Sequence, residues 1–404
     1  MTGSDFLLFL QPSKNIKLQE TMKNILLFVL ALGMMSGFRA SAQDDAGEVK
    51  IGEYIFTGEK VVPHTPVKDQ HRSGTCWSFA GTSFIEAEVM RKGGPELDLS
   101  DMWAVRHAYE RRAENYVKLH GKYNFGPGGE PHQVMETLAD RGFVTEEAYD
   151  GLTIGEDLHT HGEMDNVLEA FVEAIVENKN RKLSPVWMQA YNGILDAYLG
   201  EMPETFEYME AQFTPEKFAE VVMALNPGDY VEVTSYQHQP YYRNFLLKIP
   251  DNWDYEMYYN VSMVDLTNII DFGLERGYSV AWAADVSCKG FNHKKGLALI
   301  PEKDWADMRE GERDSVFIVP VKQKEITPEM RQEAYENYTT TDDHSMHIIG
   351  YAEDQDGNRW YKVKNSWASD SNDFGGYFYA SKSYIQLRTI AIYASRNVVP
   401  QGID

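Results

Sequence analysis

Cysteine and basic side chains are both scarce in this 404-residue chain. The two cysteines, Cys76 and Cys288, allow at most one disulfide and no cluster of metal-binding thiolates. The absence of a C-x-x-C pair argues against a thiol–disulfide redox protein. Lysine and arginine number 38 against 62 acidic residues, so the net charge is −24. Because a surface this acidic repels phosphate backbones, we expect no nucleic-acid partner.

Long hydrophobic runs are also missing, and the most apolar stretch lies near the N-terminus. In residues 22–42, Lys23 precedes an apolar run that ends at the A-x-A pattern Ala40-Ser41-Ala42. A run of about 14 residues is too short to span a bilayer and is typical of a signal peptide, with a buried core helix as the alternative. Since signal peptides begin at the initiating Met, we predict that translation starts at Met22 and that residues 1–21 are a mis-assigned upstream start. We therefore expect an exported protein, periplasmic or secreted, without membrane contact after cleavage.

The rest of the chain predicts an α+β fold, with helices first and strands later. Its hydrophobic content of 43% is enough for a large buried core. Residues 43–60 are polar and predict a loose lead-in, and residues 61–404 predict the folded domain. The last third carries short apolar runs and an Asp356-Gly357 hairpin turn. We expect a helical half facing an antiparallel β half, with a large, mainly helical segment over roughly 145–275.

Cys76 is the strongest candidate for a reactive residue. Helical periodicity begins at this cysteine, directly after a loop that contains Gly74. The partial positive charge of a helix N-terminus favours a thiolate, which is the nucleophilic form of cysteine. The backbone N–H of Cys76 is unpaired in a first helical turn, and the side-chain amide of Gln70 lies six residues earlier. Together these two donors predict an oxyanion hole.

His344 and Asn365 are the candidate base and the residue that orients it. His344 begins a predicted strand, and Asn365 follows a second predicted strand after the hairpin turn. Such a hairpin places both side chains at one end of the sheet, where the Asn amide can fix the imidazole and Trp367 can shield the bond. His347 competes for the role of base, but positions 344 and 347 point to opposite faces of a strand. For the same reason we expect no metal pair here.

Together, Gln70-x5-Cys76-Trp77, the strand that starts at His344 and Asn365-Ser366-Trp367 resemble the papain family of cysteine peptidases. The resemblance implies a papain-like fold, peptide substrates, no cofactor and no metal. It assigns catalytic roles to Cys76, His344, Asn365 and Gln70. It also implies that Gly128, Gly129 and Trp367 contribute to substrate binding, with the Gly-Gly pair bonding the peptide backbone.

The spacing indicates a particular branch of the family. Cys76 and His344 are about 270 residues apart, against about 130–150 in ordinary papain-like enzymes. An insertion of this size resembles the bleomycin hydrolase and aminopeptidase C branch, which implies aminopeptidase action and a homo-oligomer, commonly a hexamer. The branch has a C-terminal arm whose carboxylate captures the substrate amine, and here the arm looks shortened. Endopeptidase action is therefore the second hypothesis, and a catalytically silent papain fold used for binding is the third.

Three positions depart from the papain pattern or have no role in it. Ser73 stands where secreted relatives usually carry a disulfide cysteine, and Ala368 replaces the glycine usual after Asn-Ser-Trp. We expect a slightly altered backbone at Ala368. For Cys288 we expect a buried residue without a function.

Overall fold

The computed structural model describes residues 47–400, except residue 181. The predicted signal peptide and the residues before it lie outside this part of the chain. Within the described residues, no helix is long and apolar enough to cross a membrane.

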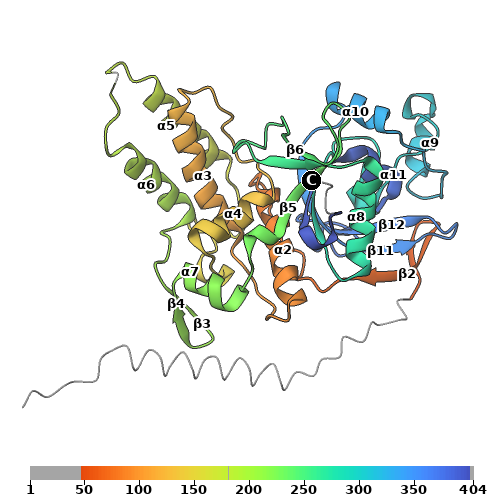
Figure 1. Cartoon of the computed structure of the whole chain (residues 1–404), viewed down its shortest axis with the longest axis horizontal. Helices are drawn as coiled ribbons and strands as arrows, with labels where there is room; N and C mark the ends of the chain where they lie inside the picture. Colours follow the sequence, from red (N-terminus) through yellow and green to blue (C-terminus); the bar gives the residue numbers. More distant parts are fainter. Residues whose placement is uncertain (1–46, 181, 401–404) are drawn as a thin grey trace, which may run out of the picture. The chain divides into compact units, whose positions relative to one another are not determined.

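Helices dominate the first half of the described chain, shown in orange to yellow-green in Figure 1. These helices are α2 (Cys76–Arg91), α3 (Asp101–Lys118), α4 (His132–Arg141), α5 (Gly162–Val176), α6 (Trp187–Leu199) and α7 (Pro215–Phe218), and a π-helical turn, Ala219–Met223, follows. Ser100 caps α3 through a 3.0 Å bond from the backbone N–H of Trp103, as its residue type predicts. A short hairpin of β3 (Phe206–Tyr208) and β4 (Ala211–Phe213) follows α6.

The second half forms one large sheet. Along the sheet the strands are β6 (Arg243–Leu246), β7 (Met257–Asn260), β5 (Tyr230–Thr234), β14 (Thr389–Ser395), β8 (Val280–Ala284), β11 (His344–Glu353), β12 (Arg359–Lys364), β13 (Tyr377–Ser381), β10 (Leu297–Ala298) and β9 (Phe291–Asn292). The pairs β5–β7 and β10–β13 are parallel and the others are antiparallel. The helices of this half are α8 (Met263–Glu275), α9 (Glu310–Ser315), α10 (Pro328–Glu336) and α11 (Lys382–Arg388).

Two expectations about the domain need correction. Residues 49–61 are not a loose lead-in, because β1 (Val49–Ile51) and β2 (Tyr54–Val61) pair with each other and β2 pairs with β11. Tyr54 and Phe56, two positions apart on β2, are both buried, as expected for one face of a strand. The polar residues around them made this segment look like a loop in the sequence. The segment 145–275 is also not mainly helical throughout, since its last part supplies β5, β6 and β7 to the sheet.

Helix α2 connects the two halves. It contacts α3 and α4 on one side and β11 on the other. Its residues from Trp77 to Val89 are all buried, as expected for a helix enclosed on every face. Gly81 permits a close approach, because a Cβ at that position would lie 2.4 Å from Cγ2 of Val134 on α4. The N-terminus of α2 is therefore held firmly against the start of β11.

Candidate active site

The predicted nucleophile lies at the first residue of α2. Thr75 precedes it as the N-cap, and the Ser78 N–H donates to the Thr75 carbonyl at 2.9 Å. The half-buried Cys76 Sγ accepts a hydrogen bond from the backbone N–H of Ser345 at 3.4 Å. Because Ser345 directly follows His344, the fold brings the thiol to the beginning of the strand that carries the predicted base.

His344 and Asn365 are in direct contact. His344 Nε2 lies 2.7 Å from Asn365 Oδ1, and both side chains are buried. Asn365 Oδ1 also accepts the Ser366 N–H at 2.8 Å, so this end of the amide is the oxygen. An oxygen acceptor requires the proton on Nε2 of the imidazole, which leaves the Nδ1 lone pair free to take the thiol proton. The hairpin therefore assembles the arrangement expected from the sequence.

His293 continues this set of hydrogen bonds and was missed in the sequence. Its Nδ1 lies 3.3 Å from Asn365 Nδ2, and its Nε2 lies 2.7 Å from the Ser371 hydroxyl. The Ser371 hydroxyl donates its proton to the Ala368 carbonyl at 2.7 Å, so it accepts a hydrogen bond from His293 Nε2. In the neutral imidazole the other nitrogen, Nδ1, is then an acceptor and receives the Asn365 NH₂ group. Nothing near His293 in the sequence marks it, because β9 and the turn after it bring it to Asn365 only in the folded chain.

Trp367 covers the His344–Asn365 bond. Its ring centroid lies 4.7 Å from that of His344 and 4.9 Å from that of His293. The position fits shielding of the catalytic bond from water, as expected. Ala368, the next residue, has a φ of +63°, so the altered residue sits in the left-handed region where glycine is favoured.

Gln70 is fixed beside the Asn365 segment. Its backbone N–H donates to the Ser366 carbonyl at 2.9 Å, and the Ser366 hydroxyl donates to Gln70 Oε1 at 2.6 Å. Since Oε1 is held in this way, the Nε2 amide is the end available to an oxyanion, and it has no partner among the described residues.

Gly128 and Gly129 lie against Trp77, the residue after the nucleophile. A Cβ at Gly129 would lie 3.0 Å from the Trp77 ring, and the Trp77 Nε1 donates to the Pro127 carbonyl at 3.0 Å. The guanidinium of the buried Arg112 donates to the Gly128 carbonyl, so this carbonyl already has a protein partner. The Gly-Gly pair is thus adjacent to the nucleophile, as the resemblance implies, but one of its carbonyls is already bonded.

The electrostatics around the thiol differ from the expected thiolate. Burial raises the pKa of Cys76 to about 12, and the carboxylates of Asp251 and Glu130 add to the effect. Burial also lowers the pKa of His344 to about 4. Burial, the largest cause, therefore outweighs the helix N-terminus and favours the neutral thiol over the thiolate.

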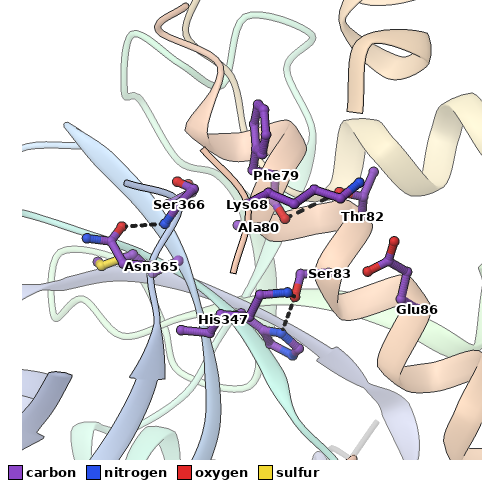
Figure 2. A pocket seen from close by; sticks show the side chains of 12 residues that line it. Lys68, Phe79, Ala80, Thr82, Ser83, Glu86, His347, Asn365 and Ser366 are labelled. Atoms are coloured by element: carbon purple, nitrogen blue, oxygen red, sulfur yellow. Dashed lines mark hydrogen bonds between the residues drawn. The ribbon is translucent and has the colours of Figure 1, made fainter. Parts of the chain in front are cut away.

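His347 has a separate, structural role. Its Nδ1 lies 2.8 Å from the Ser83 hydroxyl of α2, and Ser83 Oγ also accepts from Lys364 Nζ at 2.8 Å. The Thr65 hydroxyl donates to Glu86 Oε2 and accepts from Lys364 Nζ, so Glu86 belongs to the same buried cluster. Figure 2 shows Ser83, His347 and Glu86 around a cavity of about 10 Å³, room for about one water. The two histidines thus diverge, as the strand geometry predicts.

One group in the described residues has the spacing of metal ligands. Ligand atoms of His132, Glu136 and Asp254 lie within 4.8 Å of one another. His132 already contacts Asp254 at 3.0 Å and Glu232 at 3.1 Å, and Arg111 pairs with Glu136. Although burial opposes it, Asp254 and Glu232 raise the pKa of His132 well above its usual range. An imidazolium between two carboxylates accounts for this group without a metal.

Cys288 takes no part in these contacts. It is a free, half-buried thiol whose Sγ donates to the Tyr384 hydroxyl at 3.5 Å. Burial raises its pKa. The bond to Tyr384 fits a packing residue, and its lack of a function stays a prediction.

Comparisons with known proteins agree with this geometry. The model of the Peptidase C1-like family matches residues 173–404, and that of the papain family cysteine proteases matches residues 57–183. The first match covers more than half of the chain, which therefore belongs to the Peptidase C1-like family, a group of papain-like cysteine peptidases.

Individual relatives match over shorter stretches. A cathepsin L-like peptidase of Aedes aegypti is 34% identical over 98 residues, which is 24% of this chain and 25% of the relative. The oryzain gamma chain of Oryza sativa subsp. japonica is 38% identical over 87 residues, 21% of each chain. The chain thus spans about a quarter of the length of these curated relatives. Among solved structures, PepW from Lactobacillus rhamnosis shares the fold, with a TM-score of 0.65 and 18% identity over 85% of this chain and 82% of PepW.

Proposed function

We propose that this protein hydrolyses peptide bonds through a covalent acyl–enzyme at Cys76. One observation carries the proposal: Cys76 Sγ lies 3.4 Å from the N–H that follows His344, and His344 is oriented by Asn365 at 2.7 Å. The thiol thus lies beside the residue that follows the base, and the base contacts its orienting residue, which supports a triad of this kind.

The reaction begins with proton transfer from the Cys76 thiol to Nδ1 of His344. The sulfur then bonds to the carbonyl carbon of the scissile peptide, and the Gln70 amide and the Cys76 N–H stabilise the oxygen that becomes negative. When the C–N bond breaks, the imidazolium of His344 gives its proton to the leaving amine. A water molecule, deprotonated by the same imidazole, then hydrolyses the thioester. No step uses a metal or an organic cofactor.

Aminopeptidase action is the specificity that we propose first. It is supported by Asp251, whose carboxylate acts electrostatically on Cys76 and would attract a protonated substrate amine. We also propose that the protein is exported and assembles as a homo-oligomer. These two proposals rest on the N-terminal sequence pattern and on the resemblance to the bleomycin hydrolase branch.

The experiment is hydrolysis of a peptide panel under reducing conditions by the wild-type protein, Cys76→Ala and Cys288→Ala. Cys76→Ala should lose activity and labelling by a thiol-reactive probe, whereas the matched Cys288→Ala control should keep both. Activity that survives in Cys76→Ala would refute the mechanism. Labelling of Cys76 without hydrolysis of any peptide would instead support the silent papain fold.

A further inference from the structure

The carboxylate of Asp251 lies directly against the predicted substrate-binding glycines. A Cβ at Gly128 would lie 2.3 Å from Asp251 Oδ1 and 2.6 Å from Oδ2. The backbone N–H of Asp251 donates to Asp342 Oδ2 at 2.9 Å, and Asp342 is two residues before His344. Asp251, from the loop between β6 and β7, therefore joins the Gly128 loop to the segment that leads into the base.

This carboxylate has no protein partner. Neither oxygen of Asp251 forms a hydrogen bond or an ion pair with any described residue. The nearest cation, Arg112, donates to the Gly128 carbonyl and lies over the Trp253 ring at 4.5 Å. Burial and the neighbouring Asp342 raise the pKa of Asp251 to about 7, although Arg112 opposes this shift. A partly buried carboxylate without a protein partner is open to a cationic ligand.

A second unpaired acid lies close by. Glu130 is 1% exposed, and its Oε2 has no hydrogen-bond partner among the described residues. Glu130 acts electrostatically on both Asp251 and Cys76. Burial and the neighbouring acids raise the pKa of Glu130 well above its usual range, and a cationic ligand bound nearby would oppose this shift.

We propose that Asp251 binds the protonated α-amine of the substrate and thereby gives the peptidase a preference for substrates with a free N-terminus. The inference deepens the proposed function and rests on it. An ammonium bound beside the Asp251 carboxylate forms charge-assisted hydrogen bonds with it. It also offsets the negative charge that disfavours the thiolate of Cys76, so amine binding and activation of the nucleophile are coupled. An N-acetylated substrate provides neither effect.

The test compares an aminoacyl fluorogenic amide with its N-acetylated form, using the wild-type protein, Asp251→Asn and Asp356→Asn. Asp356 is exposed in the β11–β12 hairpin turn and serves as the matched control for loss of one negative charge. Asp251→Asn should lower kcat/KM for the free-amine substrate about 10- to 100-fold, as expected for a lost charge-assisted bond. Activity on the acetylated substrate should not fall, and alkylation of Cys76 should be as fast as in the wild type or faster.

The outcomes separate this inference from the proposed function. If the wild type cleaves both substrates equally, or if Asp251→Asn keeps the preference for the free amine, the inference is wrong and the peptidase activity stands. If Asp251→Asn loses activity on both substrates while Cys76 alkylation is normal, Asp251 serves the reaction rather than amine selection, and the inference is again wrong. If the wild type cleaves neither substrate nor any peptide of the panel, the proposed function fails, and the inference fails with it.

Discussion

Replacing His293 with alanine tests whether the hydrogen bonds behind Asn365 determine the orientation of the catalytic imidazole. His293 Nδ1 accepts the Asn365 amide at 3.3 Å, and Asn365 Oδ1 receives the Nε2 proton of His344 at 2.7 Å. Without His293, the Asn365 amide has lost the partner of its NH₂ group and can rotate. A rotated amide presents NH₂ to His344 and favours the tautomer that cannot accept the thiol proton.

The size of the effect follows from the bond that is lost. Leaving a buried amide donor unpaired costs about 1–3 kcal/mol. If this cost falls on the orientation of Asn365, the rate decreases about tenfold for each 1.4 kcal/mol. We therefore expect kcat to fall about 5- to 100-fold with KM little changed. His293→Gln, which restores an acceptor oxygen, should recover much of the loss.

A double-mutant cycle provides the decisive assay. Peptide hydrolysis is measured for His293→Ala, Asn365→Ala and the double variant, with urea unfolding to show that each protein is folded. If His293 acts through Asn365, the second substitution should add little to the first. Fully additive effects, or a kcat within twofold of the wild type in folded His293→Ala, would refute the reasoning.

Four further predictions concern stability and pH. Ala368→Gly should raise the free energy of unfolding by about 0.5–1 kcal/mol, measured in urea, because it relieves a left-handed alanine; an unchanged or lower value would contradict this. Glu86→Ala should destabilise the fold by about 3–5 kcal/mol in the same assay, since it removes a buried carboxylate that acts on the Lys364 ammonium and accepts bonds from Thr65 and the Leu99 N–H; a loss below about 1 kcal/mol would count against a buried charge network. Burial lowers the pKa of His344 to about 4, so its neutral, basic form persists down to that pH. In a pH profile of hydrolysis of the acetylated substrate, the rate should therefore fall near pH 4 rather than near pH 6.5. Because the pKa of Asp251 is raised to about 7, its carboxylate forms only as pH rises through that value. The preference for the free-amine substrate over the acetylated one should therefore grow near pH 7. A ratio of the two rates that does not change with pH would oppose the role of Asp251 in amine binding.

The predictable part of the site is local. Cys76, Gln70, His344 and Asn365 each carry a signal in the residues beside them: a helix start after a glycine loop, a strand start, or the residues that follow a hairpin. The hairpin itself has the Asp356-Gly357 turn, and the register His347↔Lys364 follows from it.

The unpredictable part depends on tertiary proximity. His293 and Asp251 stand in segments with no helical or strand period, and only the fold carries them to Asn365 and Gly128. The strands at 49–61 were missed because β2 is stabilised by pairing with β11, a contact about 300 residues distant, and not by its own composition. The raised pKa of the Cys76 thiol was also missed, since local helix geometry reports neither its burial nor the carboxylates that other segments bring to it.

The position of β14 has a consequence for when the enzyme first becomes competent. This strand spans Thr389–Ser395, yet in the sheet it lies between β5 and β8, and β8 in turn supports β11, the strand that carries His344. A ribosome must therefore release the chain through Ser395 before the sheet behind the catalytic histidine can close. A nascent polypeptide that already contains nucleophile, base and orienting amide still lacks this strand, so the order of synthesis itself delays assembly of the site until β14 has been made.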